Sequence, residues 1–87
     1  MNRVEMYTTA ICPYCVSAKD FLKRKGWTYE EIRVDLDIAR REEMLARSGG
    51  RRSVPQIFIN GVHVGGYDEL AAADREGRLR ELTEAAK

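Results

Sequence analysis

Residues 56–64, Gln-Ile-Phe-Ile-Asn-Gly-Val-His-Val, constrain the fold more than any other segment of this 87-residue chain. Two runs rich in β-branched and aromatic side chains flank Asn60-Gly61, a dipeptide that supplies the two positive φ angles of a type I′ turn. The segment therefore predicts a β-hairpin, with one strand over residues 56–59 and the other over residues 62–64. Gly65 and Gly66 then end the second strand.

The first half of the chain predicts a strand, a helix and a second strand. Residues 3–8 have the composition and alternation of the first strand. Pro13 suits the first turn of the helix, and Gly26 suits the left-handed cap at its end. Residues 27–34 predict the second strand. Because such crossovers are right-handed and join parallel strands, these two strands are predicted to lie parallel in one sheet.

A second helix follows, and Asp35 or Asp37 can cap its N-terminus. The run Ser48-Gly49-Gly50 ends it. Arg41 and Arg47 are predicted to point away from its apolar side. The predicted apolar stripe comprises Ile38, Met44 and Leu45.

Two more helices are predicted after the hairpin. Asp68 can cap the first of them, whose apolar face includes Leu70 and Ala73, and Gly77 separates it from a final amphipathic helix. The whole chain, residues 1–87, is predicted to be one domain, because this length supports one hydrophobic core. The predicted fold class is α/β, with a four-stranded mixed sheet and helices on both faces.

The balance of charge argues against some classes of function. Fifteen Lys and Arg residues stand against fourteen Asp and Glu residues, so a net charge of +1 gives no basis for binding nucleic acid or a membrane surface through bulk charge. No run approaches the ~18 apolar residues of a membrane span, and the first residues lack the apolar run of a signal peptide. We therefore expect a cytoplasmic protein, in which a structural disulfide is disfavoured because cytosolic thiols are kept reduced.

The segment Cys12-Pro13-Tyr14-Cys15 places two cysteines at the predicted start of the first helix. Both sulfur atoms then lie on one side of the first turn and reach disulfide distance with little backbone movement. Cys12, at the N-cap, meets unpaired backbone N–H groups and the positive end of the helix dipole, which favour its thiolate. Cys15 lies inside the helix, where we expect a higher thiol pKa. A Cys-x-x-Cys pair beside a βαβ pattern is typical of thiol redox chemistry.

A lowered thiol pKa makes a cysteine a better leaving group from a disulfide, but it hardly changes the rate at which the cysteine attacks one. A fall from about 8.5 to about 5 raises the thiolate fraction at pH 7 roughly thirtyfold. Intrinsic nucleophilicity falls by about the same factor, since the Brønsted slope is ~0.4–0.5. Cys12 is therefore predicted to gain chiefly as a leaving group, which suits a sulfur that turns over many mixed disulfides.

An inert or structural cysteine pair and a metal site are the alternatives to redox chemistry. A bridge that closes so short a loop contributes only ~2 kcal/mol on the loop-entropy model. Two thiolates and the distant His63 do not complete a tetrahedral metal site, and we expect His63 to be solvated on its strand. The sequence therefore favours Cys12 and Cys15 as catalytic residues, with no metal.

Three segments together resemble the glutaredoxin family: residues 12–15, residues 53–59 (Ser-Val-Pro-Gln-Ile-Phe-Ile) and residues 65–68 (Gly-Gly-Tyr-Asp). Their order and approximate spacing make the chain similar to a short bacterial dithiol glutaredoxin over nearly its whole length. The resemblance implies a thioredoxin fold and a glutathione-dependent thiol–disulfide oxidoreductase that acts as a monomer. Glutathione would be its reducing co-substrate, and disulfide-containing or glutathionylated proteins would be its partners.

The resemblance also implies a glutathione site. Pro55 matches the family's cis-proline, which leaves the backbone of Val54 to pair with the cysteinyl part of glutathione like an added strand. Residues 66–68, at a helix N-terminus, would hold the γ-glutamyl end: their backbone N–H groups would bind its carboxylate, and Asp68 would pair with its ammonium group. Tyr14 would flank the bound sulfur, and Arg41 matches the position that contacts the glycyl carboxylate. The complete implied set is Tyr14, Arg41, Val54, Pro55, Gly66, Tyr67 and Asp68.

One departure from the family affects charge near the cysteines. The family often carries a lysine where this chain has Thr9, and Arg51 or Arg52 can offset the missing charge. Three other functions stay open at this point. They are a redoxin reduced by a flavoprotein thioredoxin reductase, an iron–sulfur carrier in which two protomers share a cluster through Cys12 and glutathione, and a non-catalytic interaction module.

Overall fold

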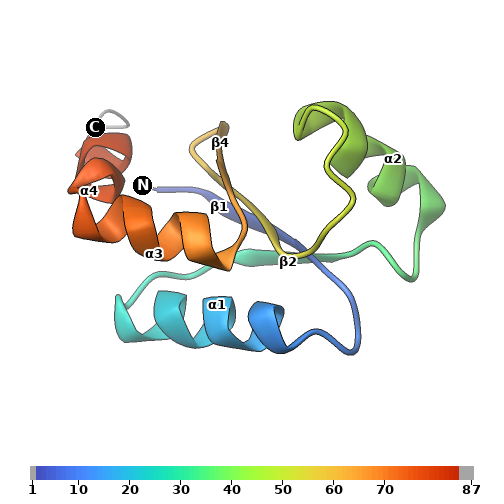
Figure 1. Ribbon diagram of the computed structural model, residues 1–87, viewed down its shortest axis with the longest axis horizontal. Helices are drawn as coiled ribbons and strands as arrows, with labels where there is room; N and C mark the ends of the chain where they lie inside the picture. The colour runs from blue at the N-terminus through green and yellow to red at the C-terminus, as the bar shows by residue number, and fades with distance from the viewer. Residues whose placement is uncertain (1, 85–87) are drawn as a thin grey trace.

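The computed structural model describes residues 2–84, which form a four-stranded sheet with helices on both faces (Figure 1). The strands are β1 (Val4–Thr8), β2 (Glu30–Arg33), β3 (Gln56–Ile59) and β4 (Val62–Gly65). The helices are α1 (Pro13–Arg24), α2 (Ile38–Arg47), α3 (Tyr67–Arg75) and α4 (Arg78–Glu84). The strand order is β2-β1-β3-β4, with β1 parallel to β2 and the other pairs antiparallel. The predicted α/β fold and its mixed sheet are confirmed.

The predicted hairpin forms on the predicted two-residue turn. Asn60 and Gly61 adopt φ angles of 52° and 83°, as a type I′ turn requires, and Ile59 lies opposite Val62. The register shifts between Ile57 and Phe58, so β3 and β4 are not paired regularly along their full length. The turn therefore follows from its own two residues, whereas the strand pairing is irregular at the end of the hairpin away from the turn.

The end of α1 explains why β2 is shorter than predicted. Gly26 has a positive φ of 75°, and its N–H donates to the Lys23 carbonyl at 3.0 Å. The N–H of Trp27 donates to the Leu22 carbonyl at 3.0 Å, which completes a Schellman cap. Trp27 therefore closes the helix, and pairing with β1 starts only at Glu30.

One face of the sheet carries α1, α3 and α4 and is packed by apolar side chains. Its fully or nearly buried members are Val4, Met6, Ala18, Leu22, Ile57, Ile59, Leu70, Ala73 and Leu79. These side chains come from two strands and three helices, so their burial sets how the helices sit on the sheet. The packing thereby fixes the N-terminal ends of α1 and α3.

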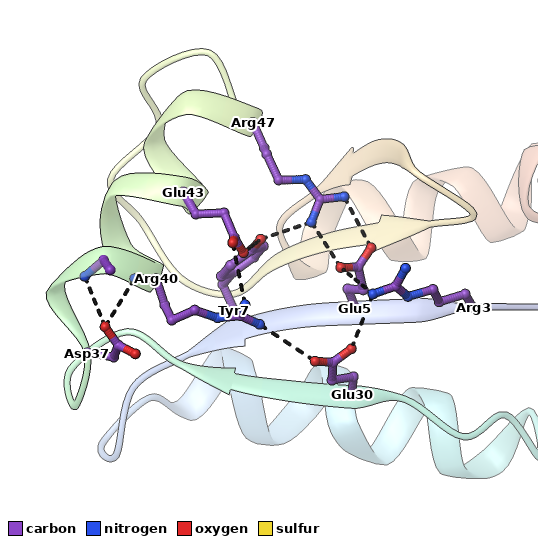
Figure 2. A network of polar contacts seen from close by, with 9 residues as sticks. Arg3, Glu5, Tyr7, Glu30, Asp37, Arg40, Glu43 and Arg47 are labelled. Atoms are coloured by element: carbon purple, nitrogen blue, oxygen red, sulfur yellow. Dashed lines mark hydrogen bonds and ion pairs between the residues drawn. The ribbon is translucent and has the colours of Figure 1, made fainter.

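The opposite face of the sheet carries α2, and charged side chains join the two (Figure 2). Arg47 donates to both carboxylate oxygens of Glu5 at 3.0 and 3.1 Å and to the Tyr7 hydroxyl at 2.9 Å. The Tyr7 hydroxyl donates to Glu43, and the Arg47 guanidinium lies 4.0 Å from the centre of the Phe58 ring. This bidentate bond lowers the pKa of Glu5, although burial of the carboxyl acts the other way.

The predicted inward face of α2 was wrong in two residues. Arg47 points toward the sheet and not away from it, and Ile38 is 76% exposed. At 100° per residue, Arg40, Met44 and Arg47 lie on one side of the helix and Ile38 lies on the other. Hydrophobicity alone misassigned this face because the buried acceptor Glu5 makes a guanidinium favourable there. Asp37, rather than Asp35, caps the helix by accepting from the N–H groups of residues 39 and 40.

The last helices follow the expected break. Gly77, with a φ of 80°, lies between α3 and α4, and Leu79 of α4 is buried in the apolar cluster. No helix within residues 2–84 is long and apolar enough to cross a membrane.

Candidate active site

The two cysteines form a disulfide at the N-terminus of α1. Cys12 is the N-cap, Pro13 is the first helical residue, and the Cα atoms of Cys12 and Cys15 are 5.1 Å apart. The N–H of Cys15 donates to Cys12 Sγ at 3.1 Å. Cys12 is half-buried, whereas only 1% of Cys15 is exposed. Cys12 is therefore the sulfur that a substrate can reach, and its position favours a thiolate once the disulfide is reduced.

The loop before Cys12 is tied to the end of β2. The Asp35 carboxylate accepts from the N–H of Ala10 at 3.1 Å and from two nitrogens of Arg33 at 2.7 Å each. The hydrogen bonds from Arg33 lower the pKa of Asp35 to about 2, and the Ala10 N–H acts in the same direction. Asp35 thus holds the cysteine loop instead of capping α2.

A cleft of about 170 Å³ lies beside the disulfide. Its lining residues are Tyr14, Arg51, Ser53, Val54, Pro55, Gly66, Tyr67, Asp68 and Glu69. The loop before β3, the N-terminus of α3 and the first turn of α1 each contribute, so the cleft joins segments far apart in sequence. Six of the seven residues that the resemblance implied for glutathione lie together here. Arg41 is the exception: it is exposed on α2 and does not line the cleft.

The loop before β3 approaches the disulfide through Val54. Its carbonyl oxygen lies 3.6 Å from Cys12 Sγ. The Val54–Pro55 peptide bond is cis, as the family resemblance implied. Within residues 2–84, no hydrogen-bond partner occupies the N–H of Val54. The backbone of this residue is therefore placed to meet a molecule bound to the sulfur.

Hydrogen bonds from Gln56, which in turn contacts His63, hold the loop before β3 in place. Gln56 is fully buried, and its Nε2 donates to the carbonyl and hydroxyl oxygens of Ser53 at 3.0 and 3.2 Å. His63 Nε2 lies 2.7 Å from Gln56 Oε1, and the imidazole stacks on Phe58. Burial lowers the pKa of His63, and Arg51 adds to this effect. His63 is only partly exposed and not fully solvated as predicted, because it lies directly opposite Phe58 in the hairpin and its ring stacks on that side chain.

The cap of α3 is Gly66 and not the predicted Asp68. Glu69, three residues after Gly66, accepts from the Gly66 N–H at 2.9 Å and from Arg51 at 2.6 Å. The Gly66 hydrogen bond lowers the pKa of Glu69, and Arg51 adds to this effect. Asp68 is exposed in the first turn of the helix and lines the cleft. The first N–H groups of α3 have no acceptor within the helix and can therefore bind a carboxylate.

Sequence reasoning did not place Ser53 and Glu69 in the site, and for Arg51 it predicted only that this residue or Arg52 could offset the charge missing at Thr9. A signal existed for Glu69, since a Glu three residues after a helix N-cap is typical of a capping box. The ion pair between Arg51 and Glu69 gave no such signal, because it depends on the packing of a loop against a helix 18 positions away. Within residues 2–84, no three His, Cys, Asp or Glu side chains are grouped as metal ligands.

Comparisons with known proteins agree on the family. A family model described as Glutaredoxin matches residues 4–64. Glutaredoxin 3 of Escherichia coli (strain K12) is 50% identical over 82 residues, which cover 94% of this chain and 98% of that protein.

Solved structures give the same result. The solution structure of glutaredoxin from Brucella melitensis superposes with a TM-score of 0.80 at 47% identity, over 98% of this chain and 91% of the other. A crystal structure of a buckwheat glutaredoxin–glutathione complex superposes with a TM-score of 0.84 at 30% sequence identity. The match covers 98% of this chain and 80% of the buckwheat chain. The thioredoxin fold that the resemblance implied is thus confirmed.

Proposed function

Because this chain belongs to the glutaredoxin family and is a thiol–disulfide oxidoreductase, we propose that it uses glutathione to reduce protein disulfides and glutathione mixed disulfides. The observation that carries this proposal is the cleft beside Cys12, which brings Tyr14, Val54, Pro55 and the N-terminus of α3 together. A related protein forms the glutathione complex named above, which supports the same use of the cleft here.

The proposed reaction begins from the dithiol. The Cys12 thiolate attacks one sulfur of a substrate disulfide, forms a mixed disulfide, and releases the other substrate sulfur as a thiolate. Cys15 then attacks Cys12 Sγ, which releases the reduced substrate and leaves the disulfide between Cys12 and Cys15. Two glutathione thiols supply the two electrons that restore the dithiol. The first attacks Cys12 Sγ and releases Cys15 as a thiolate, and the second attacks the glutathione sulfur of that mixed disulfide, which releases Cys12 as a thiolate and yields glutathione disulfide.

The cleft would hold glutathione during these steps. The backbone of Val54 would pair with the cysteinyl unit, next to the bond that forms at Cys12. The free N–H groups at the start of α3 would bind the γ-glutamyl carboxylate, and Asp68 would pair with the ammonium group. In this proposal the protein acts as a cytoplasmic monomer on disulfide-containing and glutathionylated proteins.

Removing each sulfur separately tests the proposal. We expect Cys15→Ser to keep most turnover of a glutathione mixed disulfide and to lose most reduction of a protein disulfide, because only the second reaction needs an internal resolving thiol. Cys12→Ser should abolish both reactions. Turnover is measured with glutathione and glutathione reductase, following NADPH oxidation. An active Cys12→Ser variant would rule the mechanism out.

The source of electrons needs its own comparison. We expect the wild-type protein to turn over faster with glutathione and glutathione reductase than with thioredoxin reductase, at matched concentrations. The outcome against the proposal is the reverse order, since the cleft would then serve something other than glutathione.

A further inference from the structure

The cleft contains a carboxylate that belongs to the protein. Glu69 Oε1 lies 2.6 Å from the Arg51 guanidinium and also accepts the Gly66 N–H at 2.9 Å. Arg51 comes from the loop before β3 and Glu69 from α3, so the ion pair links the two sides of the cleft. Both side chains are only partly exposed, at 39% and 48%.

The charges that line the cleft disfavour binding of an anion while Arg51 and Glu69 are paired. Among the described lining residues, Arg51 is the one cation, and Asp68 and Glu69 are both acidic. Glutathione carries two carboxylates and one ammonium group. Asp68 can pair with the ammonium, but a carboxylate that approaches Arg51 meets a guanidinium whose charge is already partly neutralised by Glu69 at Nη1.

From this geometry we infer that Glu69 is a specificity-determining residue, an internal carboxylate that competes with a carboxylate of the substrate for Arg51. The inference rests on the proposed glutathione function and adds a residue that weakens binding. Competition with Glu69 weakens the bond that a substrate carboxylate can make to Arg51, so glutathione binds less tightly and leaves more readily than it would with a free Arg51. A shuttle that must release glutathione in every cycle benefits from that weakness.

Helix capping alone would also explain why Glu69 lies near Gly66, and one substitution separates the two roles. Glu69→Gln retains an oxygen that accepts the Gly66 N–H but removes the charge that holds Arg51. A residue that only caps α3 would therefore leave substrate binding unchanged in this variant. A residue that competes for Arg51 would change it.

The experiment compares two disulfide probes that share one small neutral thiol. One probe joins that thiol to glutathione, and the other joins it to cysteamine, which has an ammonium group and no carboxylate. We expect Glu69→Gln to lower KM for the glutathione probe about two- to fivefold, the range for a partly exposed ion pair, with kcat unchanged. KM for the cysteamine probe should not fall. Equal thermal midpoints for the variant and the wild type would show that the cap is kept.

A matched control and a double variant complete the test. Glu76→Gln removes the same charge at the C-terminal end of α3, away from the cleft, and should leave both KM values at wild-type levels. Arg51→Gln should raise KM for the glutathione probe, and adding Glu69→Gln to it should have no further effect, because the two residues act as one pair.

Two results would overturn the role of Glu69. They are a KM in Glu69→Gln equal to that in Glu76→Gln, or the same fall in KM when Arg51 is already replaced. Failure of the proposed function looks different. In that case the wild-type protein would show no preference for the glutathione probe over the cysteamine probe.

Discussion

The two faces of the central sheet attach their helices by different means. On the side of α1, α3 and α4, buried aliphatic side chains from strands and helices interdigitate. On the side of α2, the smaller apolar cluster around Met44 is extended by a charged network in which Arg47 joins Glu5 and Tyr7 (Figure 2). Apolar burial is insensitive to pH and weakly sensitive to salt, whereas the bonds of Arg47 depend on ionised carboxylates.

This difference bears on the active site, because its parts are supported from both faces. The N-termini of α1 and α3, with Cys12 and the N–H groups proposed to bind a carboxylate, are held by the apolar face. The loop that carries Arg51, Ser53 and Val54 leaves the end of α2 and enters β3. Substitutions that remove charge on the α2 face should therefore disturb the geometry of the cleft more than that of the disulfide.

The largest effect is expected from a cavity on the apolar face. Leu22 of α1 is fully buried, and Leu22→Ala should lower the free energy of unfolding by about 2–5 kcal/mol. Urea denaturation of the oxidised protein at low and at high salt measures it. The loss should be the same at both salt concentrations, and a loss that disappears in high salt would contradict the apolar description of this face.

A smaller loss is expected from the charged face. Arg47→Met keeps much of the side-chain stem but leaves the Glu5 carboxylate without its bidentate partner. We expect a loss of about 2 kcal/mol, below the roughly 3–5 kcal/mol of a fully buried pair, because 28% of the Arg47 side chain is exposed.

Two further variants show how much of the stability lost in Arg47→Met comes from the carboxylate left without Arg47. Adding Glu5→Leu to Arg47→Met should recover part of the stability, since it removes a nearly buried carboxylate whose remaining partner is the exposed Arg3 at 3.5 Å. Arg24→Met, which breaks an exposed ion pair with Asp20 on α1, should change stability by less than about 0.5 kcal/mol. If Arg47→Met matched Arg24→Met, the network would contribute nothing to holding α2.

The smallest effect is a difference in acid sensitivity. The pKa of Glu5 is lowered from its ordinary 4.5 in the folded protein by the hydrogen bond from Arg47. Its contribution is therefore present above pH 4.5 and is lost as the pH falls through the folded pKa. Unfolding curves between pH 6 and pH 3 should show a steeper loss in wild type than in Glu5→Gln. Other carboxyls with lowered pKa values are present in both proteins and cancel, so parallel curves would contradict the role of Glu5.

Signals that lie within a few residues predicted much of this molecule. The turn at Asn60 and Gly61, the cap at Gly26 and the placement of Cys12 at a helix N-terminus depend on local backbone preferences. The family resemblance added the cis bond before Pro55 and the identity of most cleft residues. Each of these features depends on short-range geometry or on a motif read in order along the chain.

Features that depend on distant partners were misassigned. Arg47 looked like a surface cation, but Glu5, 42 positions away, makes the interior favourable for it. His63 looked solvated, but pairing of the two hairpin strands brings Phe58 and Gln56 against one part of its ring. The glutathione position implied for Arg41 is still a prediction, and the structure puts Arg51 in the cleft instead.

By itself, the sequence determined the order of the elements, the turns and caps that join them, and a cysteine pair that can form a disulfide in one helical turn, because these need only neighbouring residues. Tertiary structure alone decided that charged groups would join the apolar cluster in holding α2, that Arg51 would reach α3, and that Glu69 would lie in the cleft. Those outcomes required desolvation and pairing between groups that meet only when the sheet has formed.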